Sequence, residues 1–256
     1  MEEKNPIQSA ARIFLILETL AETGPIGLIE LSTRLELHKS TVHRMLLSLS
    51  TMGYVRKEVD GKYALTFKLA NVAGKMLANV NLISVVHPFI EELANRCAET
   101  VHFVQRRGLD VCYLDKVSPV IPQESAIRMA SQVGLLRPLY CSGVGKAILA
   151  ELSDKDVAYI WENSEIEKKT EYTIVSFEKL MEEIKQIRER GYAEDIEENE
   201  MGVRCVAVCI RNHRNEPVNA FSISAPVGRM TKERVLGLAE EILKTKEMIM
   251  REMHPR

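Results

Sequence analysis

Three short helical segments followed directly by a β-hairpin, all within residues 13–65, constrain the fold of this chain more than any other feature. In each segment the apolar residues recur three or four positions apart, as they do on one face of an α-helix. These residues are Ile13, Leu17 and Leu20, then Leu28, Leu31 and Leu35, then Val42, Met45, Leu46 and Leu49. Gly24-Pro25 separates the first segment from the second, and only a few residues separate the second from the third. This spacing predicts a helix-turn-helix.

The hairpin follows the third helix at once. Tyr54–Val59 and Lys62–Leu65 flank Asp60-Gly61, and an Asp-Gly pair between alternating apolar residues indicates a two-residue hairpin loop. A helix-turn-helix with such a hairpin behind it is a winged helix-turn-helix, and the third helix is then expected to read the DNA major groove.

The third helix and the hairpin carry polar and basic residues away from their apolar positions. Hydroxyl groups suit phosphates or base edges, and arginine forms bidentate bonds with guanine. The residues expected to bind DNA are Lys39, Ser40, Thr41, His43, Arg44, Arg56, Lys57 and Lys62. Residues 1–65 hold eight basic and eight acidic residues, so a plain helical packing module is the alternative interpretation.

Size and composition bound the other possibilities. The 256 residues suffice for two domains, and a net charge of −2 draws the chain as a whole to neither nucleic acid nor membranes. The sequence has no apolar run of about 18 residues. Its N-terminal MEEKNPIQSA lacks the apolar core of a signal peptide, so a cytoplasmic location is expected. Five scattered cysteines predict no disulfide framework, and we expect no metal and no cofactor.

Beyond the hairpin, the pattern predicts a linker helix over residues 66–83 and an α+β domain over residues 84–256. The linker helix either pairs with its copy in a dimer or packs within the chain. Helices are expected from about Pro88 to Ala98, from Gly143 to about Leu152, after the N-caps Ser153 and Ser176, and from about Thr231 to Met253. Gly191 is expected to end the helix capped by Ser176. Strands are expected in a hairpin from Thr100, at 125–129, at 203–210 and at 218–225.

Long stretches of both regions resemble the IclR (isocitrate-lyase-regulator) family of bacterial transcription factors. The resemblance is carried by KSTVHRMLLSLSTMGYV (39–55), DGKYAL (60–65), PLYCSGVGKAILAEL (138–152), RERGYAEDIEENEMGVRCVAVCI (188–210) and AFSISAPVGRMT (220–231). It implies a winged-helix domain over residues 1–65, a linker helix over 66–83 and a GAF- or PAS-like effector-binding domain over 84–256. It also implies a dimer or tetramer on a palindromic operator. His38 departs from the family, because many members carry proline there.

The resemblance further implies a pocket for a small organic acid. Its expected residues are Gly143, Val144, Asp195, Cys205, Ser222, Ser224 and Arg128. A helix that begins at Gly143 would offer backbone N–H groups to a carboxylate, and the two serines would share one face of a strand. Arg128 would meet a sugar-acid carboxylate, because IRMASQVGLLRPLYCSGVGKA resembles regulators of ketodeoxygluconate and pectin catabolism. Each residue also has a structural alternative, such as a turn glycine, a buried cysteine, a surface arginine or a solvated acidic loop.

These observations predict a DNA-binding regulator, expected to be a repressor, whose operator affinity a carboxylic or sugar acid controls. A second interpretation is an enzyme with Cys141 or Cys205 as nucleophile and His102 or His213 as base. The sequence shows no nucleophile elbow, phosphate loop or dinucleotide fingerprint, so we expect no enzyme. A third is a DNA-binding or scaffold protein without an effector.

Overall fold

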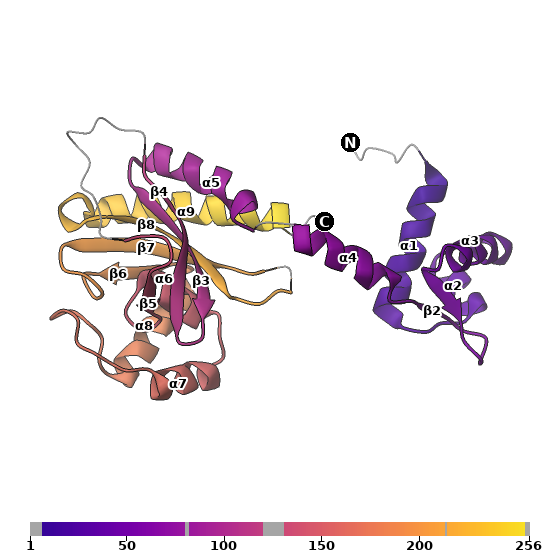
Figure 1. Cartoon of the computed structure of the whole chain (residues 1–256), viewed down its shortest axis with the longest axis horizontal. Coiled ribbons are helices and arrows are strands. Elements are labelled where there is room, and N and C mark those ends of the chain that lie inside the picture. Colours follow the sequence, from indigo (N-terminus) through magenta and orange to yellow (C-terminus); the bar gives the residue numbers. More distant parts are fainter. Residues whose placement is uncertain (1–6, 80–81, 120–130, 213, 254–256) are drawn as a thin grey trace. The chain divides into compact units, whose positions relative to one another are not determined.

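The computed structural model describes residues 7–79, 82–119, 131–212 and 214–253. The chain divides into two compact units, Met1–Val80 and Asn81–Arg256, and each is described by itself (Figure 1). Across the described residues, no helix is both long enough and apolar enough to span a bilayer.

The first unit is a winged helix-turn-helix. Its elements are α1 (Gln8–Thr23), α2 (Leu28–Arg34), α3 (Lys39–Thr51), β1 (Val55–Lys57), β2 (Tyr63–Leu65) and α4 (Lys68–Asn79). The predicted apolar positions of the three helices meet in one core, where Leu31, Val42 and Leu46 are fully buried. Each helix therefore forms because its apolar stripe is covered by the other two.

The hairpin differs from its prediction in the loop. Strands β1 and β2 pair from Val55↔Leu65 to Lys57↔Tyr63, and the Glu58 N–H donates to the Lys62 carbonyl at 2.7 Å. The loop thus spans three residues between Glu58 and Lys62 instead of two. Gly61 takes a φ of 84°, which is the left-handed conformation that closes a three-residue hairpin loop.

The second unit is an α+β domain built on one antiparallel sheet, in the order β5-β4-β3-β8-β7-β6. The strands are β3 (Thr100–Arg107), β4 (Asp110–Val117), β5 (Leu136–Pro138), β6 (Ala193–Ile196), β7 (Val203–Ile210) and β8 (Asn219–Pro226). The helices are α5 (Leu82–Cys97), α6 (Gly143–Ala150), α7 (Asp154–Asn163), α8 (Phe177–Arg190) and α9 (Lys232–Met253), with a 3₁₀ turn at Val227–Arg229.

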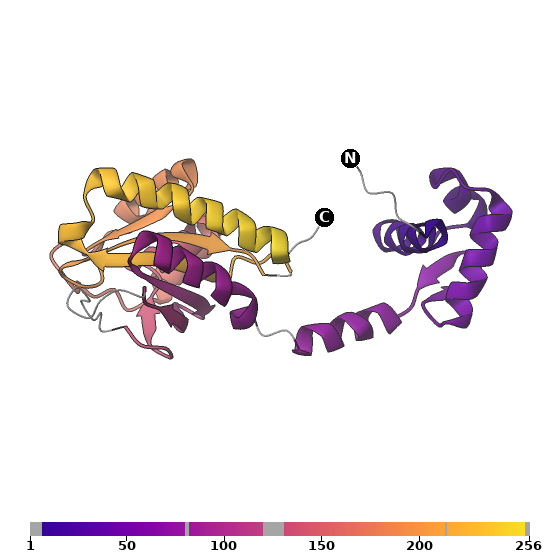
Figure 2. The same ribbon diagram turned by 90° about the horizontal axis from the view of Figure 1, so that it is seen from above.

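Each face of this sheet has its own hydrophobic core. Helices α5 and α9 lie side by side on one face, and α6, α7 and α8 lie on the other (Figures 1 and 2). Successive residues of a strand alternate between the two cores, as the pleat requires. On β8, Phe221 and Ile223 belong to the core under α5 and α9, whereas Ala220 belongs to the core under α6.

Several predicted boundaries and caps agree with this fold. Ser153 and Ser176 cap α7 and α8, because their hydroxyls accept the N–H groups of Asp156 and Lys179. Gly191 ends α8 with a φ of 83°. The strands predicted at 203–210 and 218–225 match β7 and, shifted by one residue, β8.

Three predictions need correction or lie outside the described residues. The helix expected to start near Pro88 begins at Leu82, and Pro88 lies inside it. The helix continues across the proline because buried Val86 and Ile90 pack against the core on both sides of it. The edge strands β5 and β6 were not predicted. The strand expected at 125–129 falls outside the described residues.

Candidate functional site

The exposed face of α3 carries the side chains that were expected to read DNA. Lys39, Ser40, His43 and Arg44 are exposed, and Thr41 is half-buried. Within the part of the chain that the structure describes, neither Lys39 nor Arg44 forms an ion pair. Both cations are therefore available to phosphates or base edges.

In the wing, which is the β1–β2 hairpin, two of the three basic residues expected to bind DNA are paired with acidic residues. Arg56 pairs with Glu58 at 2.9 Å, and Lys62 pairs with Asp60 at 3.3 Å. Lys57 is exposed, with its ammonium 5.7 Å from the centre of the Tyr63 ring. Exposed pairs of this kind are weak, so a phosphate can displace the acidic partner.

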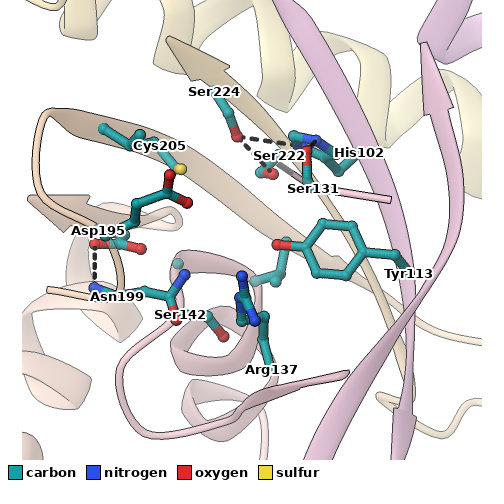
Figure 3. A pocket seen from close by; sticks show the side chains of 14 residues that line it. His102, Tyr113, Ser131, Arg137, Ser142, Asp195, Asn199, Cys205, Ser222 and Ser224 are labelled. Atoms are coloured by element: carbon teal, nitrogen blue, oxygen red, sulfur yellow. Dashed lines mark hydrogen bonds between the residues drawn. The ribbon is translucent and has the colours of Figure 1, made fainter. Parts of the chain in front are cut away.

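Six residues expected to bind an effector line one pocket in the second unit (Figure 3). They are Gly143, Val144, Asp195, Cys205, Ser222 and Ser224. Three of them form a row across neighbouring strands, because Asp195 pairs with Cys205 and Cys205 pairs with Ser224 in the sheet register. The row points to the α6 face of the sheet, so the strand pairing itself assembles one wall of the pocket.

The N-terminus of α6 forms another part of the wall. Ser142 caps this helix, since its hydroxyl accepts the Gly145 N–H at 3.2 Å. A Cβ atom at position 143 would lie 3.3 Å from the Asp195 Cβ and 3.5 Å from the Ala207 Cβ. Glycine is therefore what lets the start of α6 lie this close to β6 and β7.

Asp195 is buried, and its carboxylate holds the turn that follows β6. One oxygen accepts the N–H groups of Glu198 at 2.8 Å and Asn199 at 3.4 Å. Burial raises the pKa of Asp195 to about 6, while Lys146 and hydrogen bonds from the backbone of Glu198, Asn199 and Gly143 act against that rise. The start of α6 thus lies close to a protein carboxyl group.

Behind the pocket wall lies a buried ion pair between Lys146 of α6 and Glu198. Glu183 lies 4.0 Å from the same ammonium and also pairs with Arg190 at 2.7 Å. Burial raises the pKa of Glu198 to about 7, against the opposing effect of Lys146. Lys146 does not line the pocket, so it acts on the site through Glu198 and Asp195.

The same sheet continues through β3 and β4, where it carries polar lining residues that the sequence did not assign to the pocket. Buried His102 on β3 contacts the Ser224 hydroxyl at 3.2 Å through Nδ1 and the Ser131 hydroxyl at 2.7 Å through Nε2. Burial, with a smaller contribution from Lys116, lowers the pKa of His102 to about 3, so the imidazole is neutral at physiological pH. Tyr113 packs against this ring edge to face, with centroids 5.1 Å apart.

Arg137, Asn199 and Glu200 complete the polar lining. The predicted Arg128 lies outside the described residues, as does His213 of the enzyme alternative. Tyr113 lies on the second strand of the hairpin predicted from Thr100, whereas only the pairing of β5 with β4 brings Arg137 to the pocket.

The two candidate nucleophiles are poorly placed for catalysis. Burial raises the pKa of the Cys141 thiol to about 12 and raises that of Cys205 as well. Both thiols therefore stay protonated, and the thiolate is the reactive form of cysteine. Cys141 also lies in the core under α6 and does not line the pocket.

Sequence profiles of one protein family match both units of the chain. The profile described as "IclR helix-turn-helix domain" matches residues 9–59, and "Bacterial transcriptional regulator IclR C-terminal" matches residues 74–251. The HTH-type transcriptional regulator KdgR of Escherichia coli (strain K12) is 36% identical over 235 residues, which cover 91% of this chain and 88% of KdgR. The transcriptional repressor IclR of the same organism is 34% identical over 242 residues, with 93% and 87% covered.

Solved structures agree with these sequence matches. The crystal structure of Thermotoga maritima IclR superposes with a TM-score of 0.64 at 30% identity, over 96% of this chain and 98% of that chain. The C-terminal domain of E. coli KdgR superposes with a TM-score of 0.60 at 30% identity, over 68% of this chain and 99% of that domain.

Proposed function

The chain belongs to the IclR family of bacterial transcriptional regulators, and from this membership we propose that it represses transcription under the control of a small organic acid. In this proposal residues 1–65 bind operator DNA, residues 66–83 form the linker and residues 84–256 bind the effector. The chain is a regulator and not an enzyme.

The observation that carries the effector part is the convergence of the six residues named from the family resemblance. They come from α6, β6, β7 and β8, and all six line one pocket. The pocket offers hydroxyl groups, a carboxylate, a guanidinium and a neutral imidazole. This set fits a small ligand with several oxygen atoms, since each buried polar group needs a partner when water leaves.

The DNA part is supported by the exposed polar face of α3. In our proposal Arg44 and His43 reach base edges, while Lys39, Ser40, Thr41 and the wing residues Arg56, Lys57 and Lys62 bind phosphates. A second copy of the chain places a second α3 on the other half of a palindromic operator, because two-fold proteins match two-fold sites.

Control by the effector requires that the acid have different affinities for the arrangements of the protein that bind DNA strongly and weakly. The acid shifts the equilibrium between DNA-binding arrangements only as far as it binds one arrangement more tightly than the other. By linkage, operator DNA changes the affinity for the acid by the same factor. Both affinities are therefore needed to establish regulation.

The test uses the full chain and an operator selected from random DNA. Operator affinity is measured by fluorescence anisotropy with and without a panel of keto, hydroxy and sugar acids. An acid that changes this affinity in the wild type is expected to have no effect in Asp195→Ala, which keeps its operator affinity. Asp154→Ala, an exposed change on α7, is the control and keeps the response. A normal response in Asp195→Ala would place the effector elsewhere.

A further inference from the structure

The turn that follows β6 brings two polar residues, Asn199 and Glu200, to the pocket. Its backbone is strained, because Glu197 takes a φ of 59°, in the left-handed region that residues other than glycine seldom adopt. Such a conformation persists only where the surrounding groups hold it in place. The groups that hold this turn therefore determine where Asn199 and Glu200 lie.

Two consecutive peptide groups of this turn are each hydrogen-bonded at both ends. The first donates the Glu198 N–H to the Asp195 carboxylate at 2.8 Å, and its carbonyl accepts the Thr170 hydroxyl at 2.6 Å. The second donates the Asn199 N–H to the same carboxylate oxygen at 3.4 Å, and its carbonyl accepts the Thr173 hydroxyl at 2.7 Å. A carboxylate of the pocket and two threonine hydroxyls thus hold the same two peptide groups from opposite sides.

The direction of both hydroxyl bonds follows from the other contacts of the threonines. Thr170 and Thr173 are buried and belong to the connection between α7 and α8, residues 164–176. The Thr170 oxygen accepts the Tyr172 N–H at 3.1 Å, and the Thr173 oxygen accepts the Thr170 N–H at 2.8 Å. The two hydroxyls lie 3.3 Å apart, farther than the carbonyl that each contacts. Each therefore directs its one hydrogen to the turn.

The connection between α7 and α8 is itself fixed to the core beside the pocket. The Tyr140 hydroxyl donates to the Glu167 carbonyl and accepts the Glu167 N–H, both at 2.9 Å. Tyr140 is buried in the core under α6 and lies two residues before Ser142, which caps α6 at the pocket. The two threonines therefore project from a supported segment.

A hydrogen bond at one end of a peptide group strengthens the bond at its other end. A hydroxyl that donates to the carbonyl polarises the peptide group, so its N–H becomes a better donor to a carboxylate. Loss of the hydroxyl therefore also weakens the N–H bond to Asp195. The ion pair of Lys146 with Glu198 does not replace these bonds, because it engages the side chain of Glu198 and not the backbone.

We propose that Thr170 and Thr173 are positioning residues of the effector site, which hold Asp195, Asn199 and Glu200 where a ligand meets them. This inference rests on the proposed function, because it concerns the site that the proposed effector occupies. Neither threonine is among the described residues that line the pocket. A change at either position is therefore expected to lower ligand affinity through the turn, without removal of a group that contacts the ligand.

The experiment separates the hydroxyl group of each threonine from its methyl group. Valine keeps the shape of threonine but lacks the hydroxyl, whereas serine keeps the hydroxyl but lacks the methyl. The full-length variants are Thr170→Val, Thr170→Ser, Thr173→Val and Thr173→Ser. Thr245→Val is the matched control, because Thr245 is also buried and donates to a backbone carbonyl at 2.9 Å, but lies on α9 on the opposite face of the sheet.

Two quantities are measured for each protein. Amide hydrogen exchange, followed by mass spectrometry of peptides from the turn, reports on the N–H groups of Glu198 and Asn199. Fluorescence anisotropy with the selected operator, against increasing pyruvate, L-lactate or D-gluconate, gives the acid concentration for the half-maximal effect. These probes represent keto, hydroxy and sugar acids, and the most potent one for the wild type is used for the variants.

Each valine variant is expected to speed exchange at Glu198 and Asn199 by about 3- to 10-fold, the factor that corresponds to loss of one hydrogen bond. The half-maximal acid concentration is expected to rise by a similar factor. Both serine variants and Thr245→Val are expected to stay within about twofold of the wild type in both quantities. Exchange in β7 and β8 is expected to be the same in every protein, which shows that the domain is folded.

Each other result overturns a defined part. Wild-type exchange in both valine variants would show that the hydroxyls do not hold the turn. Faster exchange with an unchanged acid concentration would show that the pocket does not depend on them, and serine variants that match the valine variants would assign the effect to the methyl group. If no acid alters the operator affinity of the wild type, the proposed effector control fails, and the inference about its site fails with it. Failure of the inference alone requires a wild type that responds.

Discussion

The ammonium of Lys146 on α6 pairs with the carboxylate of Glu198 in the turn after β6, and both side chains are buried. The pair joins the helix that starts at the pocket to the turn that Asp195 holds. A buried pair of this kind contributes little net stability, but loss of one partner leaves the other charge without compensation.

Lys146→Met is therefore expected to lower the free energy of unfolding by about 3 kcal/mol at pH 8. The loss is expected to shrink at pH 6, because Glu198 without Lys146 takes up a proton to remain buried. Urea unfolding followed by the fluorescence of Trp161, the one tryptophan of the chain, measures this in the second unit. The double variant Lys146→Met/Glu198→Gln is expected to recover much of the loss. A loss that is equal at both pH values would contradict the ionic explanation.

Asp195→Asn is expected to stabilise the free protein at alkaline pH. Burial raises the pKa of Asp195 to about 6, above its ordinary value of 3.8. A raised acid pKa favours the folded state below the ordinary pKa, and that contribution is lost as pH rises through 6. Asparagine does not ionise, so it avoids this loss, which we place at about 3 kcal/mol. Urea unfolding at pH 8 and at pH 4 should show the gain at pH 8 and little difference at pH 4.

Gly145→Ala and Gly237→Ala are expected to have opposite effects on stability. A Cβ atom at position 145 would lie 2.3 Å from the carbonyl oxygen of Leu139, and this backbone atom cannot move aside cheaply. We expect a loss of about 2 kcal/mol. Position 237, inside α9, has nothing within 4 Å of an added Cβ, so alanine there should add about 0.5–1 kcal/mol. Equal melting temperatures for the two variants would contradict the expected clash between a Cβ at position 145 and the Leu139 carbonyl.

Arg44→Ala is expected to weaken binding to the selected operator by at least about 10-fold and to reduce its preference over random DNA, since a bidentate arginine–guanine contact is worth about 1–3 kcal/mol. Arg251→Ala removes the same charge from an exposed position on α9 and should leave both values unchanged. Anisotropy titrations at one fixed salt concentration provide the comparison. Equal weakening on operator and random DNA would reassign Arg44 from base reading to phosphate binding.

The helices and central strands were predictable because their signals are local. Leu31, Val42 and Leu46 follow helical spacing, and Ser153 and Ser176 mark helix starts by a hydroxyl next to free N–H groups. The edge strands gave no such signal. β6 has four residues and lies in an acidic stretch that suggests a solvated loop, and only its pairing with β7 buries Asp195.

The pocket was predictable only where the family resemblance named its residues. His102 and Tyr113 lie on the two strands of one predicted hairpin, whereas Arg137 joins them only through the pairing of β5 with β4. Sequence spacing contains no information on which strands become neighbours when the connections between them are long. The six described residues from the resemblance meet in the pocket, whereas the seventh, Arg128, lies outside the described residues.

Because of the cross-sheet row of Asp195, Cys205 and Ser224, selection for ligand preference can act separately from selection for a stable fold. Along β8, Ser224 stands between Ile223 and Ala225, which belong to the core on the opposite face of the sheet. A substitution at a row position therefore alters what the ligand meets without disturbing the packing of α5 and α9. Ligand preference can diverge among descendants of such a protein one residue at a time, while the scaffold that presents those residues stays constant.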